Sequence, residues 1–587
     1  MLRNRLIASL AAVATGAILT GCTSVGVTLP GTSTHNSTTS AGATPGSATS
    51  LAGTAGISVA AARAENAAPD AADTAWDSSA ATTITLSGSG ATASGPGVTV
   101  DGGTVTITAG GTYVLTGTLN GQVVVESGSA DEVKIVLEGA TIASSTGPAL
   151  TFADAGEAVV VLAEGTTNAL TDATTYTDTA DDAPNAALYS KADLTIGGAG
   201  SLTVNGRAND GIAGADGLVI TGGTIAVTAA DDGIRGKDHL VVTGGNVTVE
   251  AGGDALKSTN EADADSGYID ISGGTLTLTS GTDGLDAFTD VIVSGGTVTV
   301  RSGGGAAAKV GSDASAKGIK GGSNVVLGGG TISVDAADDA VHSNSVVSVA
   351  GGTLTLASGD DGIHAESSLT LGDARVTITR SYEGLEAQNI TVAGGTTDVT
   401  ATDDGLNVSA AAAAATAQGR GGGGMSQVID GLVSVSGGTL TIHAGGDGFD
   451  SNGDAVITGG TVIVDGPLSN GNGALDVNGA FTISGGTLLA VGSAGMAETP
   501  DASSPQGWLQ ASVTGAAGSR IEVLAGSTVI AEYTAGKDFA NLVYSSPEIT
   551  RGQQYTVAVN GQATTVAAGT VTGGGMRGPG SLGGPRG

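Results

Sequence analysis

Four acidic residues recur at an almost constant spacing in the middle of the chain. They lie 22, 22 and 21 residues apart and are Asp339, Asp361, Glu383 and Asp404. Three of them directly follow a second acid: Asp338, Asp360 and Asp403. Clustered carboxylates supply the hard oxygen ligands that Ca²⁺ prefers, with six to eight ligands in loose geometry. The spacing therefore suggests a calcium site, provided that the fold stacks these residues.

Stacked carboxylates repel one another unless something compensates their charge. At a strand spacing of about 4.8 Å the repulsion is roughly 1–4 kcal/mol per pair, depending on exposure. We therefore predict Ca²⁺ as a cofactor, with these seven acids as its ligands. The alternative is that they are solvated turn residues, because Asp-Gly is a common turn dipeptide.

A second set of polar residues recurs along the repeat. Each member follows the acidic position of its own repeat unit by three residues. Its candidate carbohydrate contacts are Arg235, Lys257, Lys320, His342 and His364. The cations would donate charge-assisted hydrogen bonds to an anionic ligand. Their alternative role is pairing with neighbouring acids, and the two histidines are read as paired or solvated in preference to catalytic. Small residues, Gly or Ala, follow each acid, and we interpret this strip as a shallow groove for an extended polymer.

The elements that would position these residues follow from a second repeat. A Gly-Gly pair recurs with a base period of 22 residues, beginning at Gly222, Gly244 and Gly273 and continuing to Gly485. Apolar residues alternate on both sides of each pair, as in LVITGGTIAV, which is typical of strands joined at a tight turn. A period of this length indicates a solenoid. We predict an all-β parallel β-helix of about three short strands per coil.

Composition shifts divide the chain into segments. They are a signal peptide at 1–22, a disordered Ser/Thr/Gly/Ala/Pro linker at 23–75, a β-rich N-terminal cap with irregular coils at 76–185, the regular β-helix at 186–500, a C-terminal β cap at 505–571 and a disordered tail at 572–587. Within the β-helix, Ser409–Gln427 is a low-complexity insertion. In the C-terminal cap, Asn560-Gly561 predicts a hairpin turn.

The overall charge excludes some partners. A net charge of −35 and a pI near 4.1 argue against binding to nucleic acid or to anionic membrane surfaces. Both tryptophans, Trp76 and Trp508, lie outside the coils. We therefore expect no aromatic platform for sugar stacking on the coils, and a bound sugar would be held by polar groups and ions.

The N-terminus begins with Arg3 and Arg5, followed by a short apolar run. Leu19-Thr20-Gly21-Cys22 resembles the bacterial lipobox, which implies that Cys22 is lipidated and becomes the mature N-terminus. The protein would then lie on the extracellular face of a bacterial membrane, attached to it by the lipid alone. The alternative is an ordinary secretory signal.

The coil motifs resemble those of bacterial carbohydrate-binding-domain-containing proteins, typified by a clostridial cell-surface protein that binds polygalacturonic acid. The runs that carry the resemblance include NDGIAGADGLVITGGTI, DDAVHSN, GDDGIHAE and NLVYSSPEITRGQQYTV. It covers roughly residues 76–560. The resemblance implies a right-handed, single-stranded parallel β-helix with bound Ca²⁺ and affinity for an acidic polysaccharide such as polygalacturonate.

Two other classes remain open. One is a pectate-lyase-like or polygalacturonase-like enzyme, and the other is a structural surface protein or adhesin, because a fold alone does not decide function. Ser358-Gly359-Asp360-Asp361 looks like one polygalacturonase motif, but the other motifs of that group are absent as such. We favour a monomeric binding protein and assign no catalytic residue.

Overall fold

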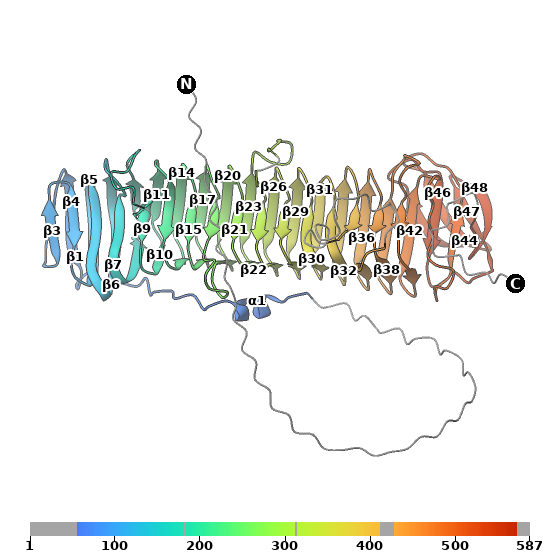
Figure 1. The fold of residues 1–587 in the computed structure, drawn as a ribbon, viewed down its shortest axis with the longest axis horizontal. Helices are drawn as coiled ribbons and strands as arrows, with labels where there is room; N and C mark the ends of the chain where they lie inside the picture. Colours follow the sequence, from blue (N-terminus) through green and yellow to red (C-terminus); the bar gives the residue numbers. More distant parts are fainter. Residues whose placement is uncertain (1–55, 181–182, 312–313, 411–427, 572–587) are drawn as a thin grey trace, which may run out of the picture. The chain divides into compact units, whose positions relative to one another are not determined.

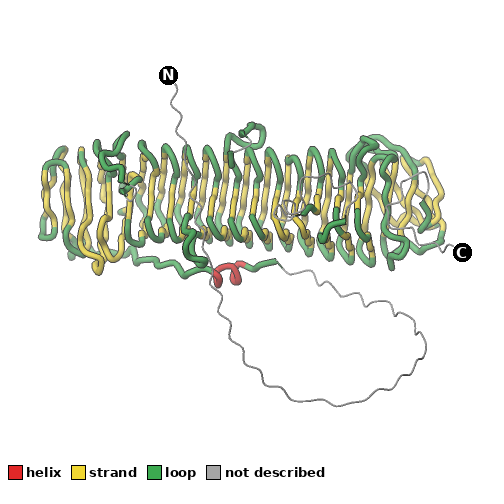
Figure 2. Tube along the Cα trace, in the orientation of Figure 1, coloured by secondary structure: helices red, strands yellow, loops and turns green. Residues whose placement is uncertain are grey.

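The computed structural model describes residues 56–180, 183–311, 314–410 and 428–571. Several predicted features lie outside these ranges: Cys22, the signal peptide at 1–22, the tail at 572–587 and most of the Ser409–Gln427 insertion. Within the described ranges the chain is almost entirely β, with one short helix (Figures 1 and 2). The sheet is mostly parallel, as predicted.

Each coil contributes three strands, and each strand pairs in parallel with the equivalent strand of the next coil. The pairing partners lie 22 residues apart in coils without insertions, as in Ile234↔Leu256 and Thr224↔Asn246. The strands therefore form three columns along the row of coils seen in Figure 1. Residues at equivalent positions of the 22-residue repeat therefore lie beside one another in neighbouring coils.

The first column carries the predicted site. Its strands are β9 (Ala186–Ser190), β12 (Asp210–Gly214), β15 (Ile234–Gly236), β18 (Leu256–Ser258), β21 (Leu285–Ala287), β24 (Ile319–Gly321), β27 (Val341–Ser343), the first parts of β30 (Ile363–Leu371) and β32 (Leu385–Val392), β34 (Leu406–Val408), β37 (Phe449–Ser451) and β40 (Leu475–Val477). The acidic position lies two residues before most of these strands.

The second column follows after a corner. Its strands are the second part of β7 (Leu150–Leu162), β10 (Leu194–Gly198), β13 (Leu218–Ile220), β16 (His239–Val242), β19 (Tyr268–Ile271), β22 (Asp290–Val293), β25 (Asn324–Leu327), β28 (Val346–Val349), the second parts of β30 and β32, β35 (Leu432–Val435), β38 (Asp454–Ile457) and β41 (Phe481–Ile483). The Gly-Gly pair comes next.

The third column follows the Gly-Gly corner. Its strands are β8 (Thr167–Thr171), β11 (Ser201–Gly206), β14 (Thr224–Ala229), β17 (Asn246–Ala251), β20 (Thr275–Ser280), β23 (Thr297–Ser302), β26 (Thr331–Ala336), β29 (Thr353–Ser358), β31 (Arg375–Arg380), β33 (Thr396–Ala401), β36 (Thr439–Ala444), β39 (Thr461–Asp465) and β42 (Thr487–Gly492). The second Gly of each pair has a positive φ, 97° at Gly223 and 66° at Gly395, which confirms that the pair makes the turn.

The core is a continuous apolar cluster inside the three columns. The small residue after each acid belongs to this interior. A Cβ added to Gly284 would lie 2.2 Å from Cγ1 of Val300 in the third column, and one added to Gly318 would lie 2.2 Å from Cγ1 of Val334. The interpretation of this strip as a surface groove is therefore wrong, because the residues face inward and leave room for branched side chains opposite.

The coils that carry Ala in place of this Gly show the same fit. In the third column, Leu278 and Leu356 stand in register with Val249 and Val334. These two leucines belong to the coils that have Ala255 and Ala340 after the acid. Glycine is thus found opposite valine or isoleucine, which branch at Cβ, and alanine opposite leucine, which branches one carbon further out.

The N-terminal strands close one end of the solenoid. They are β1 (Thr82–Gly88), β2 (Ala91–Ala93), β3 (Val98–Asp101), β4 (Thr104–Ile107), β5 (Gly111–Asn120) and β6 (Gln122–Ala143). Two antiparallel pairs, β1–β2 and β3–β4, stand at this end, and β5 and β6 pair in parallel with the strands that follow.

Residues 57–76, which we call the N-terminal strap, lie along the second column. The strap contains α1 (Val59–Glu65), whose Ala62 packs against Ile292 and Val326. Further along, the hydroxyl of Tyr268 donates to the carbonyl of Ala67 at 2.6 Å. The structure thus differs from the disordered linker expected over 23–75, because outward-facing apolar residues of the second column bind the end of that segment.

The C-terminal cap ends the row of coils at β42. Strand β46 (Asn541–Ser545) pairs antiparallel with β42 and with β43 (Trp508–Ala511). A separate antiparallel sheet contains β45 (Thr528–Thr534), β44 (Arg520–Ala525), β47 (Gln554–Val559) and β48 (Gln562–Ala567). Asn560 and Gly561, with φ of 50° and 83°, join β47 to β48, which confirms the predicted hairpin turn.

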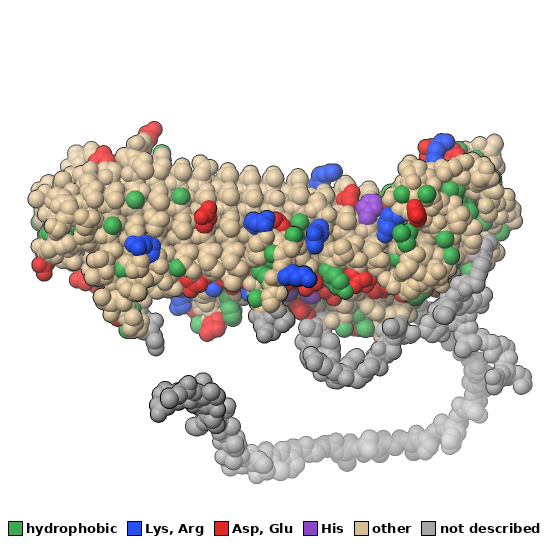
Figure 3. All heavy atoms as spheres, turned by 90° about the horizontal axis from the view of Figure 1, so that it is seen from above, with side chains coloured by type: hydrophobic (Ala, Val, Ile, Leu, Met, Phe, Trp, Pro, Cys, Tyr) green, Lys and Arg blue, Asp and Glu red, His purple; other side chains and the backbone are tan. Residues whose placement is uncertain are grey.

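The surface is dominated by uncharged groups on the side shown in Figure 3, where charged side chains appear singly or in small groups. Within the described ranges, no helix has both the length and the apolar character required to span a membrane.

Candidate functional site

The acids of the repeat are buried beside the first column. Asp210, Asp254, Asp283 and Asp339 are 5% exposed or less. One oxygen of a buried acid accepts the backbone N–H at the same position of the next coil, as between Asp254 Oδ1 and the N–H of Asp283 at 2.8 Å. The same bond joins Asp361 N–H to Asp339 Oδ1 at 3.0 Å. The acids therefore hold neighbouring coils together, whether or not they also bind a ligand.

In the first coils the second oxygen of these acids faces a cation. Arg235 Nη2 lies 2.9 Å from Asp210 Oδ2, and Lys257 Nζ lies 2.6 Å from Asp254 Oδ2 and 3.2 Å from Asp232 Oδ2. Burial lowers the pKa of Lys257, but hydrogen bonds and ion pairs with both acids outweigh it, so the pKa is raised. The predicted contacts Arg235 and Lys257 are thus paired with neighbouring acids.

Two lysines continue this pattern. Lys320 Nζ lies 3.0 Å from both Asp283 and Asp286. Lys317, which stands at an acidic position itself, lies 2.9 Å from Asp338 and 2.7 Å from Asp339. Lys317 was not among the predicted site residues, although its place in the 22-residue register could have revealed it.

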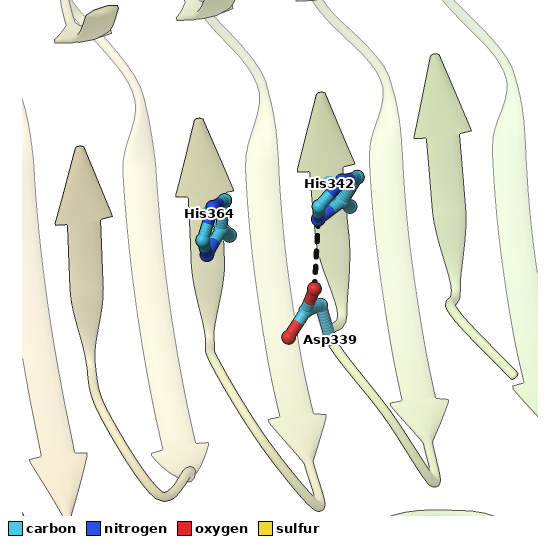
Figure 4. Close-up of side chains that lie close together, drawn as sticks. All are labelled: Asp339, His342 and His364. Carbon is cyan, nitrogen blue, oxygen red and sulfur yellow. Dashed lines mark hydrogen bonds and ion pairs between the residues drawn. The ribbon is translucent and has the colours of Figure 1, made fainter. Parts of the chain in front are cut away.

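The two predicted histidines occupy neighbouring coils and lie side by side (Figure 4). In each ring Nδ1 lies within hydrogen-bond distance of the carboxyl group three residues earlier, at 2.8 Å for His342 and Asp339 and 2.9 Å for His364 and Asp361. The Nε2 atom of His342 lies 3.1 Å from Asn344 Oδ1.

His364 has a second carboxylate partner that sequence reasoning did not assign. Its Nδ1 atom lies 3.0 Å from Glu386 Oε2 in the next coil. Burial opposes the charged form of the ring, but hydrogen bonds to Asp361 and Glu386 raise the pKa of His364 to about 11. His364 therefore favours its charged form and lies between two acidic groups, of which Asp361 is itself driven toward the protonated form, since burial raises its pKa to about 8.

Beyond His364 the acids have no such cation. Within the described ranges, no ion pair with Lys or Arg is formed by Glu383, Asp404, Asp447, Asp450, Asp476 or Glu498. Burial, together with repulsion from neighbouring acids, raises the pKa of Asp450 to about 9 and that of Glu498 to about 8. Burial also raises the pKa of Glu383 to about 7.

The seven predicted calcium ligands therefore fall into three groups. Asp338, Asp339 and Asp360 each offer an oxygen, and these atoms lie within 4.8 Å of one another. Asp361 belongs with His364 and Glu386. Glu383, Asp403 and Asp404 belong to the acidic region, where Asn407 donates to Glu383 at 2.9 Å and the buried Oδ1 of Asn407 has no hydrogen-bond partner.

These groups differ in how well they suit a calcium ion. Lys317 pairs with both Asp338 and Asp339, and His364 pairs with Asp361, so each of these two groups already contains one cation. Among the described residues, Glu383 and Asp404 have no such cation, and the unpartnered buried Oδ1 of Asn407 lies beside Glu383, but the oxygens of Glu383, Asp403 and Asp404 do not form one of the clusters whose ligand atoms lie within 4.8 Å of one another. The donors around Glu383 and Asp404 are of the kind that Ca²⁺ takes.

A groove of about 940 Å³ lies at the N-terminal end of the first column. Its charged lining residues are Lys191, Arg235, Lys237, Lys257, Asp210, Asp231 and Asp232. Four cations thus face three acids, in a chain whose net charge is −35. Arg235 and Lys257 are therefore placed together in a groove, whereas Lys320, His342 and His364 are not among its lining residues.

Two lysines of this groove were missed from the sequence. Lys191 and Lys237 are exposed, and neither has an ion-pair partner among the described residues. They occupy equivalent positions two coils apart, with Ala215 between them, which corresponds to a rise of about 9.6 Å. The repeat could have revealed both residues, because Lys237 stands five residues after the acidic position of its coil and Lys191 occupies the equivalent position.

Two exposed aromatic side chains lie on the coils, although the sequence predicted no aromatic platform there. Phe288 is 49% exposed at the end of β21, and Tyr382 is 47% exposed beside Glu383. A hydrogen bond to Asp403 raises the pKa of Tyr382 to about 12. Counting tryptophans missed both residues, since their exposure depends on the corners at which they stand.

The parallel coils, the buried acids and the cationic groove define a solenoid with a candidate ligand-binding face. A family model described as "Carbohydrate-binding domain-containing protein" matches residues 101–362 and 361–534, which is more than half of the chain. The chain therefore belongs to the family of carbohydrate-binding domain-containing proteins.

Two described proteins are similar to parts of this chain. A carbohydrate-binding domain-containing protein of Acetivibrio thermocellus is 42% identical over 122 residues, which are 20% of this chain and 43% of that protein. The chain thus spans less than half of the length of this curated relative. A solved structure of a polysaccharide lyase-like protein from C. thermocellum, a gadolinium derivative, is 31% identical, with a TM-score of 0.35, and covers 43% of this chain and 94% of that one.

Proposed function

We propose that the protein binds an acidic polysaccharide, such as polygalacturonate, in the groove at the N-terminal end of the first column. The observation that carries this proposal is the pair of exposed lysines, Lys191 and Lys237, which have no ion-pair partner among the described residues. They border Arg235 and Lys257 in the same groove. Ammonium and guanidinium groups form charge-assisted hydrogen bonds to carboxylates, so the groove attracts uronates although the chain as a whole repels them.

Membership of the carbohydrate-binding family supports a carbohydrate ligand, and the groove supports its acidic character. We further propose that the columns form a right-handed, single-stranded parallel β-helix. In this proposal the polymer lies against the first column, where Tyr382 and Phe288 add apolar surface to the polar contacts.

Calcium is part of the proposal. Glu383, Asp403 and Asp404, with Asn407 Oδ1, are the residues that would hold Ca²⁺, and the ion would relieve the repulsion among the acids of the last coils. Coordination positions left open on such an ion can accept uronate oxygens. Asp338, Asp339, Asp360 and Asp361 are weaker candidates, because Lys317 and His364 already compensate part of their charge.

Cys22 gives the proposed location, since the lipobox resemblance predicts a lipid anchor on the extracellular face of a bacterial membrane. Cys22→Ser should release the protein into the medium or block its processing. Membrane retention equal to that of the unaltered protein would count against the anchor.

The function is tested by incubating the full chain with insoluble polygalacturonate and with cellulose, each with Ca²⁺ and with chelator. We expect retention on polygalacturonate that depends on Ca²⁺. Chelator-insensitive retention on cellulose alone would contradict the proposal. The appearance of unsaturated or reducing ends would assign the protein to the enzyme class, and retention on neither polymer would favour a structural role.

A further inference from the structure

Most charged residues of the groove at the N-terminal end of the first column pair with one another. Arg235 Nη2 lies 2.9 Å from Asp210 Oδ2. Lys257 Nζ lies 3.2 Å from Asp232 Oδ2. Asp210 and Asp232 are also buried, so neither offers its carboxylate freely to a ligand. These four charges hold the coils together and leave little net charge with which to recognise a second molecule.

Three charged residues of the groove are left over. Lys191, Lys237 and Asp231 are exposed, and their charged groups form no hydrogen bond or ion pair with any residue that the structure describes. An exposed charge exchanges water for a ligand at a lower cost than a buried pair does. Two ammonium groups and one carboxylate are therefore the charges that a ligand meets in the groove.

The acids that follow the lysines in the chain do not pair with them. Asp193 Oδ1 accepts the N–H of Gly217 at 2.9 Å, and Asp238 Oδ1 accepts the side-chain amide of Asn260 at 2.7 Å. Neither acid is among the residues that line the groove. The positive charge of the two lysines is therefore available inside the groove.

The three free charges stand at opposite ends of the first-column strands. Lys191 directly follows β9, Lys237 directly follows β15, and Asp231 lies three residues before β15. The strands of this column run parallel and in register. The groove therefore has an ammonium side, at Lys191 and Lys237, and a carboxylate side, at Asp231.

The two lysines stand two coils apart, with Ala215 in the coil between them. The N–H of Ala215 donates to Ser190 O at 2.8 Å and that of Lys237 to Gly214 O at 3.1 Å, which fixes this order. The rise over two coils is about 9.6 Å. One unit of an extended pyranose chain is nearly as long as one coil is high, so a chain that lies along the groove brings every second sugar to a lysine.

The carboxylate side limits what the intervening sugars can carry. In an extended chain, neighbouring sugars turn their substituents to opposite sides, so a uronate between the two lysine-bound units directs its carboxylate toward Asp231. Like charges that face one another across an interface disfavour the complex. A neutral sugar at the same place directs hydroxyl groups toward Asp231, and these donate charge-assisted hydrogen bonds to its carboxylate.

We propose that the groove prefers a polysaccharide in which a uronate alternates with a neutral sugar over one that carries a uronate at every unit. Lys191 and Lys237 bind the uronates, and Asp231 determines the specificity by repelling further carboxylates. The inference rests on the proposed function, because it names the class of acidic polysaccharide that the same groove takes.

The test compares two polymers that contain the same uronate. One is the backbone of rhamnogalacturonan, in which galacturonate alternates with rhamnose, and the other is polygalacturonate. Apparent dissociation constants are measured for the full chain at constant ionic strength and in chelator, because Ca²⁺ would bridge carboxylates and hide the repulsion. Asp231→Asn is the test variant. Asp373→Asn, at an exposed acid in the corner between the second and third columns, is the matched control for charge.

We expect the wild type to bind the alternating polymer at least about fivefold more tightly than polygalacturonate. Asp231→Asn should tighten the binding of polygalacturonate by about threefold. It should change the binding of the alternating polymer little, because asparagine still accepts hydrogen bonds from hydroxyl groups. Asp373→Asn should leave the ratio of the two constants unchanged, and melting curves establish that both variants are folded.

Equal binding of the two polymers by the wild type would overturn this inference, and so would an equal change of the ratio in Asp373→Asn. Lys191→Ala/Lys237→Ala separates this failure from that of the proposed function. If the double variant weakens the binding of polygalacturonate while the wild type does not distinguish the polymers, only the preference for alternation is wrong. If the double variant binds both polymers as tightly as the wild type, or the wild type binds neither, both proposals are wrong.

Discussion

The imidazole rings of His342 and His364 stack across neighbouring coils, with 4.9 Å between their centroids and 25° between their planes. The two rings are alike in their bond to an acid three residues earlier, but they differ in what else that acid contacts. Asp339 also has Lys317 as a partner, whereas Asp361 depends on His364, which it shares with Glu386. His364 is therefore the main positive charge beside its acidic partners, whereas His342 shares Asp339 with Lys317.

His364→Gln should destabilise the protein more than His342→Gln. Loss of the imidazolium leaves Asp361 and Glu386 close together without a cation, at a cost of about 1.5–3 kcal/mol for hydrogen bonds to charged groups. In His342→Gln, Lys317 still compensates Asp339. Urea unfolding of both variants at pH 7 measures the difference, and equal losses would contradict the role of Glu386.

The contribution of His364 should also depend on pH. Its pKa in the folded state, about 11, lies above the value of about 6.5 for an unperturbed histidine. The stabilisation is therefore complete below pH of about 6.5 and is lost as the pH rises toward 11. The stability difference between wild type and His364→Gln, measured by unfolding at pH 6, 8 and 10, should shrink along this series.

Asp450→Asn should stabilise the last coils at pH 8 in the absence of divalent cations. The folded-state pKa of Asp450 is raised to about 9, so the folded protein binds a proton that the unfolded chain has released. Stability from this group is complete below the pKa of an unperturbed Asp, about 3.9, and falls as the pH rises from there to about 9, so most of it is lost by pH 8. We expect a gain of at least about 1 kcal/mol at pH 8. Asp231→Asn, at an exposed acid in another coil, is the control and should show no gain.

Calcium should raise the melting temperature and reduce this pH dependence. A ligand that binds only the folded state stabilises it by about 2.7 kcal/mol at 100 times its dissociation constant. Glu383→Gln/Asp404→Asn should abolish the calcium effect, whereas Asp338→Asn should retain it, since Lys317 neutralises that group. A melting temperature indifferent to chelator would count decisively against bound calcium.

Lys191→Ala/Lys237→Ala should weaken retention on polygalacturonate. Each lysine offers an exposed ammonium group in the groove, and a charge-assisted hydrogen bond contributes about 1.5–3 kcal/mol, so the double variant should lose at least about tenfold in affinity. Lys309→Ala removes an exposed lysine outside this groove and should bind normally. Equal weakening by Lys309→Ala would show that overall charge, and not the groove, controls binding.

Gly284→Ala should destabilise the solenoid by about 1–3 kcal/mol, because the new methyl group would lie 2.2 Å from Val300. Adding Val300→Leu should restore part of the loss, because the coil that has Ala255 after its acid has a leucine, Leu278, at the equivalent position of the third column. Gly147→Ala is the control, at a site with open space and no positive φ. A double variant no more stable than Gly284→Ala would contradict the proposed match of branching.

The sequence alone determined the repeat and its turns. The Gly-Gly pairs recur with a base period of 22 residues because each coil needs a residue that tolerates a positive φ at the same corner, and this requirement is local. The hairpin at Asn560-Gly561 was predictable for the same reason. The alternation of apolar residues then fixed the three columns of strands and the approximate neighbours of every acid.

Only the tertiary structure decided which way the corner residues face and what lies against them. The tight fit at Gly284 depends on Val300, in the third column, and not on the Asp-Gly dipeptide to which Gly284 belongs. The placement of the strap depends on apolar residues such as Ile292, more than two hundred positions away. Lys317 and Glu386 gained their partners in the same way, since a buried charge takes its pKa and its role from groups that the fold brings beside it.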